Sequence, residues 1–423
     1  MPAVLATLAP WAMLACGVTF VALAANALRP LRHPWVVFQS FIAGLALREA
    51  ALHQLAGQLV VVGVLVWLGA LASWPGIVGI ALAALAWAAL LLLYFAARRD
   101  SGVMRLATSK KSDRVLARYP GLHLLVPALA FLRRDIAVER GTEFCTIEGT
   151  RLRLDVFRPR TPGHGRPAIV QIHGGAWMSG LKWLQGVPLL GHLAANGWVG
   201  FNVDYRLSPR AAFPAHLVDV KRAIAWVREH AEEYGVDPNF VVVTGGSAGA
   251  HLAALVGLTA DDMRYQPGFE DSDTSVAAVV AFYGIYDLTE RRRPLGRTFK
   301  RALERWVLKV PYRGREDAFV DASPIERVRA DAPPFFVVHG TADSVAPIEG
   351  ARAFVERMRE TTQVPVEYLE IAGAGHAFDI MPSHRTAAAV EAATDFLQGL
   401  HAAYVAAKPV ATPPISEAPA RSG

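Results

Sequence analysis

The chain has 423 residues and a formal net charge of +6; 53% of its residues are hydrophobic and 19% are charged. An ordinary soluble domain carries about 25% charged residues, so this chain is less charged than usual. Its low charge and its mean hydropathy of +0.27 exclude a disordered or low-complexity chain. The two cysteines exclude a disulfide framework, and no Cys/His cluster has the spacing of a zinc site, so we expect no metal.

The apolar excess lies in the first hundred residues. Residues 2–28 and 50–97 contain no Asp, Glu, Lys or Arg. A membrane-spanning helix needs about 20 apolar residues, so the second run is long enough for two helices, divided by the turn-forming sequence at 73–76. The sequence predicts an α-helical transmembrane region over residues 1–100, with three helices near 8–28, 54–72 and 77–97.

Two other interpretations of this region stay open. Residues 35–47 are apolar but short, and they fit an interfacial helix, a re-entrant segment or a fourth span. The first apolar run also resembles a cleaved signal peptide, with a small-residue site at 25–27. However, no Lys or Arg precedes that run and further spans follow it, which favours a retained helix.

The charges beside the helices predict an orientation. Arg29, Arg32 and Arg48 flank the first loop, and a second basic group follows the third helix: Arg98, Arg99, Arg105, Lys110 and Lys111. With three spans both groups fall on one side, and positive loops stay in the cytoplasm. The protein is therefore expected to be a multi-pass membrane protein with its remaining chain in the cytoplasm. A fourth span would break this agreement.

After residue 100 the composition becomes ordinary. Residues 101–134 form a basic and then apolar connector, in which 121–132 either lies on the membrane surface or packs on the following domain. Strands then alternate with helices over 135–404, which predicts an α/β fold with a largely parallel sheet covered on both faces. The expected strands are a hairpin at 143–157 and then 168–172, 198–203, 240–244, 276–282, 335–338 and 366–371. Residues 405–423 are expected to be a disordered tail.

The strongest chemical signal is the sequence Gly-Gly-Ser-Ala-Gly at 245–249, between an apolar strand and an apolar helix. That context places Ser247 on a tight strand-to-helix turn with its hydroxyl exposed. The flanking glycines remove side chains that would clash there, and the helix N-terminus favours developing negative charge. We therefore expect Ser247 to be a nucleophile.

A second signal, His-Gly-Gly-Ala-Trp at 173–177, ends the third strand. Ester hydrolysis passes through an oxyanion that needs preorganised backbone N–H donors, and we assign Gly174, Gly175 and Ala248 to that role. His173 is expected to hold this loop in place. Trp177 either binds the acyl part of a substrate or packs in the core.

Two later strands supply the partners of a serine nucleophile. Asp343 follows the strand at 335–338, and His376 follows the strand at 366–371. An imidazole must take the proton of the serine, and a carboxylate must orient that imidazole. Ser247, Asp343 and His376 also occur in the chain order of an α/β-hydrolase triad. Asp287 is a rival acid and His339 a rival base.

On these residues the chain resembles an α/β-hydrolase of the hormone-sensitive-lipase type, from about residue 136 to 402. The matching residues are His173-Gly174-Gly175, Asp204-Tyr205-Arg206-Leu207, Phe213-Pro214-Ala215, residues 245–249 and the Asp343/His376 pair. The chain departs from the usual pattern at Ala176, where a third glycine is common, and at Gly246, where an aspartate is common. With its anchor, it is similar to mycobacterial-type membrane-associated carboxylesterases and, loosely, to prenylcysteine methylesterases.

A basic segment lies where this fold commonly inserts a cap, expected at about 285–330. Residues 291–315 contain ten Lys or Arg and one Glu, above an apolar row with helical spacing: Leu295, Phe299, Leu303, Trp306 and Val310. Such a helix either lies on anionic lipid or covers the substrate pocket as a solvated cap. Apart from these basic residues, nothing in the sequence favours nucleic-acid binding, so we expect no nucleic-acid partner.

Together these features predict a membrane-anchored serine hydrolase, without cofactor, that cleaves small-molecule or lipid carboxylic esters. Two alternatives stay open: hydrolysis of amides or formamides by the same triad, and a hydrolase fold that has become a binding module. The intact triad and oxyanion loop argue against the binding module.

Overall fold

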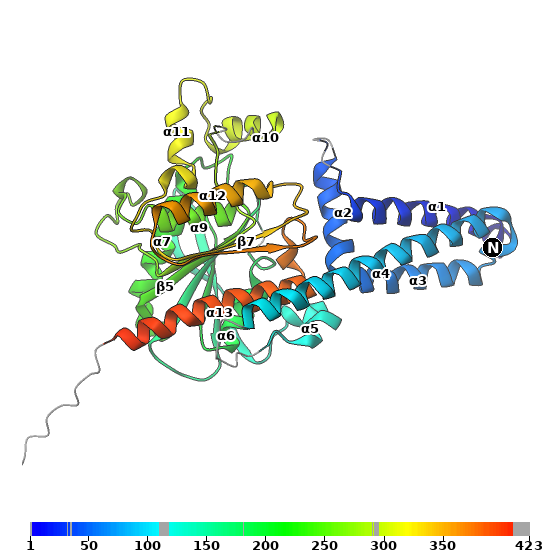
Figure 1. The fold of residues 1–423 in the computed structure, drawn as a ribbon, viewed down its shortest axis with the longest axis horizontal. Coiled ribbons are helices and arrows are strands. Elements are labelled where there is room, and N and C mark those ends of the chain that lie inside the picture. The colour runs from blue at the N-terminus through cyan, green and yellow to red at the C-terminus, as the bar shows by residue number, and fades with distance from the viewer. Residues whose placement is uncertain are drawn as a thin grey trace, which may run out of the picture.

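The computed structural model describes residues 2–31, 33, 36–109, 118–180, 182–289, 291 and 296–408. It has two parts (Figure 1): a bundle of long apolar helices formed by the N-terminal hundred residues, and an α/β domain formed by the rest. This confirms an α/β fold preceded by apolar helices.

The α/β domain is built on an eight-stranded sheet of order β1-β2-β4-β3-β5-β6-β7-β8. Strands β1 and β2 pair antiparallel, as do β2 and β4, and all other neighbours are parallel. The bounds are β1 Ile136–Ile147, β2 Thr150–Pro159, β3 Arg166–Ile172, β4 Val199–Val203, β5 Val236–Gly246, β6 Ala278–Phe282, β7 Phe335–Gly340 and β8 Val366–Ile371.

Helices cover both faces of this sheet. The larger apolar core joins one face to α7 (Ala215–Glu229), α9 (Ala248–Leu258) and α12 (Ile348–Thr361). The second core joins the other face to α6 (Val187–Ala195) and α13 (His384–Ala407). Because strands β3 to β8 run parallel, their carboxyl ends meet at one edge of the sheet, where the binding sites of such sheets form.

Most observed helices and strands differ from the predicted ones only in the residues at which they begin and end. The hairpin extends to 136–159, and its turn uses Glu148 and Gly149, both with positive φ (50° and 75°). Helix α7 ends at Glu229, and a short helix, α8 (Ala231–Tyr234), follows it. Strand β5 begins four residues early because Val236 pairs with Arg166 beyond a bulge.

The N-terminal bundle contains α1 (Pro2–Leu28), α3 (Ala51–Trp67) and α4 (Trp74–Ser109). Helices α1 and α4 cross closely at two glycines. A Cβ atom on Gly17 would lie 2.3 Å from Gly79 O, and one on Gly79 would lie 2.4 Å from the Met13 carbonyl. Small residues that let backbones approach in this way are typical of packed helices in membranes, where apolar burial gives little driving force.

Two stretches, Thr7–Leu28 and Trp74–Asp100, are long and apolar enough to cross a membrane. The predicted helix at 54–72 is shorter, because Gly69 adopts a left-handed conformation (φ 88°) and a 3₁₀ turn, η1 (Ala70–Ala72), follows. The apolar segment before α3 forms α2 (Val37–Glu49), which is bent 94° from α3. Helix α2 lies across the end of the bundle next to the α/β domain (Figure 1).

The connector and the tail differ from their predictions. Helix α4 continues through Ser109 into the predicted connector, and the middle of the connector, 110–117, lies outside the described residues. The connector then forms α5 (Gly121–Leu125) and a 3₁₀ turn, η2 (Pro127–Ala130). Helix α13 reaches Ala407, so the start of the predicted tail is helical, and 409–423 lie outside the described residues.

The basic segment forms a shorter helix than the sequence predicts. Residues 297–307 form α10 (Arg297–Ala302) and a π-helical turn, η4 (Leu303–Val307); Leu295 lies outside the described residues. Leu303 and Val307 are buried in the larger core, so part of the apolar row packs on the α/β domain. Trp306 is 38% exposed. Helix α11 (Glu316–Asp321) and a 3₁₀ turn, η5 (Pro324–Arg327), complete the insertion.

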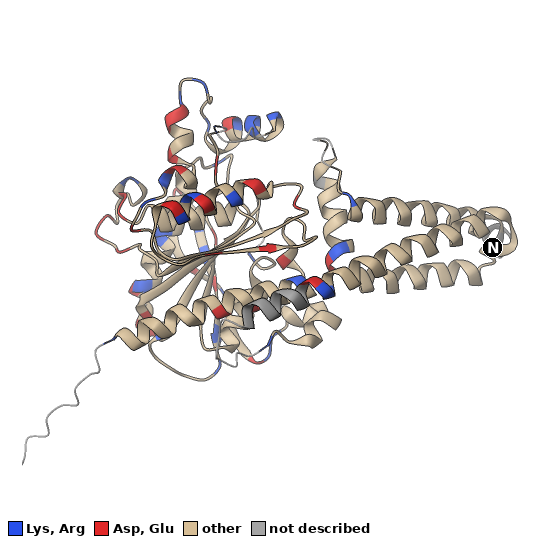
Figure 2. Cartoon of the chain, in the orientation of Figure 1, with Lys and Arg blue, Asp and Glu red and all other residues tan. Residues whose placement is uncertain are grey.

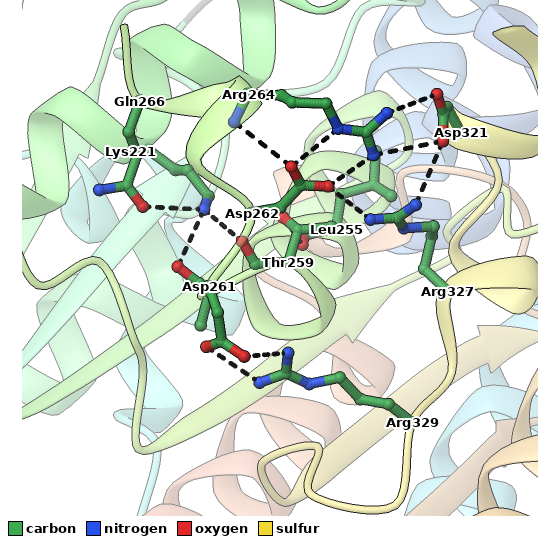
Figure 3. Close-up of polar contacts among 11 residues, drawn as sticks. Lys221, Leu255, Thr259, Asp261, Asp262, Arg264, Gln266, Asp321, Arg327 and Arg329 are labelled. Atoms are coloured by element: carbon green, nitrogen blue, oxygen red, sulfur yellow. Dashed lines mark hydrogen bonds and ion pairs between the residues drawn. The ribbon is translucent and has the colours of Figure 1, made fainter. Parts of the chain in front are cut away.

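A network of ion pairs joins this insertion to the loop after α9 (Figure 3). The carboxylate of Asp262 pairs with Arg264 and Arg327, each at 2.6 Å, and both arginines also pair with Asp321 at 3.1 Å. Beneath them the buried Lys221 donates to Thr259 O and Gln266 Oε1, and burial lowers the pKa of Lys221 to about 8. We call the four residues Asp262, Arg264, Asp321 and Arg327 the surface network.

Candidate active site

Ser247 lies where β5 ends and α9 begins, in a conformation that L-residues rarely adopt (φ 57°, ψ −119°). The neighbouring glycines make this turn possible. A Cβ on Gly245 would lie 2.5 Å from Gly249 C, and one on Gly249 would lie 2.1 Å from Ile172 O. The backbone N–H of Ser247 donates to Phe282 O at 3.0 Å, which fixes the turn against β6. The strained turn is the position expected of a nucleophile.

The structure brings the three predicted residues Ser247, His376 and Asp343 together. His376 Nε2 lies 2.8 Å from Ser247 Oγ, and His376 Nδ1 lies 2.7 Å from Asp343 Oδ2. With its proton on Nδ1, the imidazole donates to the carboxylate and accepts from the serine hydroxyl. These hydrogen bonds join side chains that are 129 and 33 residues apart in the sequence.

Asp343 is completely buried and held in one orientation. Its Oδ1 accepts hydrogen bonds from the backbone N–H groups of Val345 and Ala346, both at 2.8 Å. Burial by itself raises the pKa of this carboxyl, but the nearby His376 and the hydrogen bonds from His339 and His376 outweigh burial and lower the pKa well below its usual range. Asp343 is therefore an anion at neutral pH, which is the form that stabilises an imidazolium.

The two rivals have other partners. Asp287 Oδ1 accepts from the backbone N–H and the hydroxyl of Thr289, at 2.8 and 2.6 Å, and so shapes its own turn. His339 Nε2 lies 2.8 Å from Ala346 O and 3.4 Å from Asp343 Oδ2, behind the carboxylate. His339 thus supports the acid loop.

The predicted oxyanion loop lies beside the serine, but Gly174 contributes something other than a free donor. Its N–H donates to the side chain of Gln185, and a Cβ on Gly174 would come within 3.1 Å of Ser247 Cβ. The lack of a side chain therefore allows close approach. The chain then turns sharply, with positive φ at Gly175 (117°), Ala176 (54°) and Trp177 (61°).

His173 and Trp177 are buried side chains that hold this loop. The His173 ring stacks on Tyr205 with centroids 4.4 Å apart, and the Tyr205 hydroxyl donates to His173 O at 3.0 Å. Burial lowers the pKa of His173, which keeps it neutral. Trp177 is 1% exposed and its indole N–H donates to His251 Nδ1 at 3.3 Å, which favours the packing alternative over substrate binding.

Sequence reasoning missed a second carboxylate near the histidine. Asp379 accepts a hydrogen bond from the Tyr283 hydroxyl, and the Tyr283 ring lies 4.8 Å from the ring of His376. Burial raises the pKa of Asp379 to about 6. A Cβ on Gly246 would lie 2.6 Å from Tyr283 Oη, so this tyrosine fills the space that a side chain at position 246 would need.

It also missed a contribution from the N-terminal region. The Phe41 ring on α2 lies 5.7 Å from the His376 ring, edge to face. No local signal marks Phe41, because the contact joins residues that lie more than three hundred positions apart. Among the described residues, no group of three or more His, Cys, Asp or Glu side chains is placed to hold a metal ion.

The chain is similar to known esterases in sequence and in fold. The BD-FAE family matches residues 154–358. The chain is 41% identical over 308 residues to "Esterase LipC" of Mycobacterium tuberculosis, covering 72% of this chain and 76% of that protein. It is 47% identical over 236 residues to "Probable carboxylic ester hydrolase LipM" of the same organism, covering 56% of this chain but only 55% of LipM.

Solved structures give the same fold. A thermophilic esterase from Thermogutta terrifontis, Est2 with bound butyrate, superposes with a TM-score of 0.54 at 28% identity, covering 63% of this chain and 95% of Est2. The fold and the arrangement of Ser247, His376 and Asp343 are those of the α/β-hydrolase class. Within that class, the chain belongs to the family of carboxylic ester hydrolases that includes LipC.

Proposed function

We propose that this chain is a membrane-anchored serine hydrolase that cleaves carboxylic esters through Ser247, His376 and Asp343. The observation that carries the proposal is the unbroken series of hydrogen bonds from Ser247 Oγ through His376 to the buried carboxylate of Asp343. Membership of a carboxylic ester hydrolase family supports esters as the substrate class.

The geometry gives each of the three side chains a role. Ser247 Oγ attacks the ester carbonyl carbon while its proton passes to His376 Nε2, and Asp343 stabilises the imidazolium. The tetrahedral intermediate collapses, the ester C–O bond breaks, and the alcohol leaves with the proton from His376. Water then attacks the acyl-enzyme, with His376 again as the base, and the acid is released.

The negative oxygen of the intermediate needs donors that are already in place. Ala248 N–H, at the start of α9, and Gly175 N–H, in the sharply turned loop, are the two we assign. Gly174 is kept as the residue that permits close approach, because its own N–H is bound to Gln185. The N-terminus of α9 adds a favourable dipole.

The first test replaces the nucleophile. Ser247→Ala is expected to lower kcat for a short-chain nitrophenyl ester by about 10⁴- to 10⁶-fold. It should also abolish labelling by a fluorophosphonate probe. The matched control is Ser275→Ala, an exposed serine before β6, which should keep both activities. Near-normal turnover or labelling of Ser247→Ala would overturn the proposal.

The same enzyme preparation decides between esters and amides. A nitrophenyl ester, the corresponding anilide and an aryl formamide are compared at equal concentration. We expect the ester to be cleaved fastest, and faster cleavage of the formamide would instead assign the triad to formamide hydrolysis.

The second half of the proposal is the membrane anchor and its orientation. Arg29 follows α1, Arg48 lies at the end of α2, and Arg98 and Arg99 end the apolar stretch of α4. Figure 2 shows Lys and Arg at the end of the bundle next to the α/β domain, and no Lys, Arg, Asp or Glu on the described helices at the far end. Helices α1 and α4 would each cross once, and the bent pair of α2 and α3 would supply the third crossing, with α2 at the interface. Positive charge on the domain side supports a cytoplasmic hydrolase domain.

A reporter fused after Gly423 tests this orientation. We expect it to be active when it is a reporter that works in the cytoplasm and silent when it works only outside. The opposite pattern would mean that α2 and α3 cross separately or that the first segment is removed.

A further inference from the structure

The wall of the active site next to His376 comes from the N-terminal helices. The imidazole of His376 lies between two aromatic rings: Tyr283 of the α/β domain, with centroids 4.8 Å apart, and Phe41 of α2, at 5.7 Å. Phe41 is half-buried and packs against the second core of the domain. One end of α2 is therefore in direct contact with the base of the proposed triad.

The other end of α2 is bound to the two loops that carry the acid and the base. Arg48 Nη1 lies 3.5 Å from Ala342 O, immediately before Asp343, and 3.5 Å from Gly373 O, three residues before His376. Arg48 Nε also donates to Ala27 O at the end of α1, at 2.5 Å. A single guanidinium thus links the end of α1 to both catalytic loops.

Glu49 continues this connection into α13. Its carboxylate accepts a hydrogen bond from Ser383 Oγ at 2.7 Å and pairs with Arg385 at 3.4 Å. Arg385 in turn donates to Ala372 O in the histidine loop, at 3.1 Å. The side chains of Glu49 and Arg385 are 1% and 2% exposed, so water does not screen this pair. We call Arg48, Glu49, Ser383 and Arg385 the junction cluster.

The surroundings of α2 are apolar and exposed. Half of the Ile42 side chain is exposed on α2. In and directly beside α5 and η2 the exposed large apolar residues are Leu122, Leu125, Val126 and Leu132. His53 Nε2 on α3 lies 2.8 Å from Leu125 O, so α5 is attached to the same end of the bundle as α2. Exposed apolar side chains gathered at the end of an apolar bundle fit the boundary of a bilayer.

We propose that α2 is the membrane-facing wall of the active site and that Phe41 is a specificity-determining residue for esters that reside in the membrane. This inference rests on the proposed function. In that mechanism the leaving alcohol takes its proton from His376 Nε2, so the alcohol part of the ester leaves beside the imidazole on which Phe41 packs. A soluble, short ester needs no such wall, whereas a lipid ester must pass from the bilayer along α2.

The experiment compares two esters on the full chain in lipid nanodiscs: soluble nitrophenyl butyrate and a long-chain diacylglycerol placed in the bilayer. For Phe41→Ala, the ratio of kcat/KM for the diacylglycerol to that for the butyrate is expected to fall about tenfold, the usual effect of losing an apolar contact in a binding site. The matched control is Ile42→Ala on the same helix, for which the ratio should stay within about twofold.

Titration of reactive serine with a short fluorophosphonate counts the active sites, so a partly unfolded preparation does not imitate the effect. Phe41→Leu is a second variant that keeps an apolar side chain and should give an intermediate ratio. An unchanged ratio in both Phe41 variants, or an equal fall for Ile42→Ala, would overturn the inference while leaving the proposed function intact. Activity of Ser247→Ala on both esters would instead overturn the proposed function.

Discussion

Charged side chains join separate segments of this chain in two regions, and the two regions differ in burial. In the junction cluster, Glu49 and Arg385 are nearly inaccessible and connect the N-terminal bundle to the histidine loop. In the surface network, Arg264 is 57% exposed and Asp321 36% exposed, and the pairs connect the cap insertion to the loop after α9. The ion-pair distances in the surface network are shorter, at 2.6 to 3.1 Å against 3.4 Å for Glu49 and Arg385.

Distance alone therefore does not rank the two regions. An exposed pair is screened by water and must fix two long side chains, so it adds little. A buried pair is not a strong source of stability either, but removing one member leaves an uncompensated charge in a dry site. We expect contacts near the catalytic edge of the sheet to be sensitive to substitution and the surface network to be tolerant. Four substitutions test this difference.

The largest effect is expected at Asp343, which is buried and hydrogen-bonded on both oxygens. Asp343→Asn should lower kcat for a short nitrophenyl ester by about 10⁴-fold, because an amide cannot stabilise the imidazolium and favours the wrong imidazole tautomer. Steady-state kinetics of the purified full chain measures this. Asp287→Asn, at the rival acid, should stay within about twofold, and a large loss there with a small one at Asp343 would reverse the assignment.

The next effect is expected in the junction cluster. Glu49→Ala removes the carboxylate that Arg385 and Ser383 share, so the variant should lose about 3–5 kcal/mol of stability. Thermal unfolding of the full chain in detergent, followed with loss of fluorophosphonate labelling, measures it. An unfolding temperature equal to that of the wild type would show that the junction is not needed to hold the histidine loop.

Asp379 gives a smaller effect that depends on pH. Because its pKa is raised from 3.8 to about 6, the folded protein keeps a proton that the unfolded chain releases as the pH rises from about 4 to 6. Stability from this group is present below about pH 4 and is lost as the pH rises through 6. Asp379→Asn should therefore be more stable than the wild type at pH 8, by about 2–3 kcal/mol, with the difference vanishing near pH 4.

Thermal unfolding across this pH range measures the difference, and Asn can still accept the hydrogen bond from Tyr283. A difference that stays the same at every pH would mean that Asp379 ionises in the folded protein as it does in the unfolded chain.

The smallest effect is expected in the surface network. Arg264→Ala should cost less than about 1 kcal/mol, because the arginine is more than half exposed and Arg327 still pairs with Asp262 and Asp321. Thermal unfolding beside Glu49→Ala gives the comparison directly. If Arg264→Ala destabilises the chain as much as Glu49→Ala does, burial does not explain the difference between the two regions.

The sequence was sufficient for the features that local patterns encode. The strand-turn-helix around Ser247 and the strand ends before Asp343 and His376 were predictable because glycines, apolar runs and chain order all pointed to the same place. The apolar helices were predictable from composition. The end of α3 was wrong by five residues because Gly69 stops the helix before the expected turn.

Contacts between distant segments had no such signal. Gln185 binding Gly174 N–H, and Phe41 packing on His376, depend on how loops and helices meet in the folded chain. The basic segment was predicted as one long amphipathic helix, yet its helical turns stop at Val307, where Val307 O accepts from Phe213 N. Periodicity shows which residues are apolar but does not show which neighbour will cover them.

The tyrosine that fills the space beside Gly246 makes two positions depend on each other over evolutionary change. In the hormone-sensitive-lipase type that the sequence resembles, an aspartate is common before the nucleophile. Such a side chain here would begin 2.6 Å from Tyr283 Oη, while loss of Tyr283 alone would leave a void against His376. A substitution at either position alone is therefore expected to give a less active enzyme. We therefore expect Gly246 and Tyr283 to occur together in related sequences, as a linked pair that distinguishes one lineage of these enzymes from another.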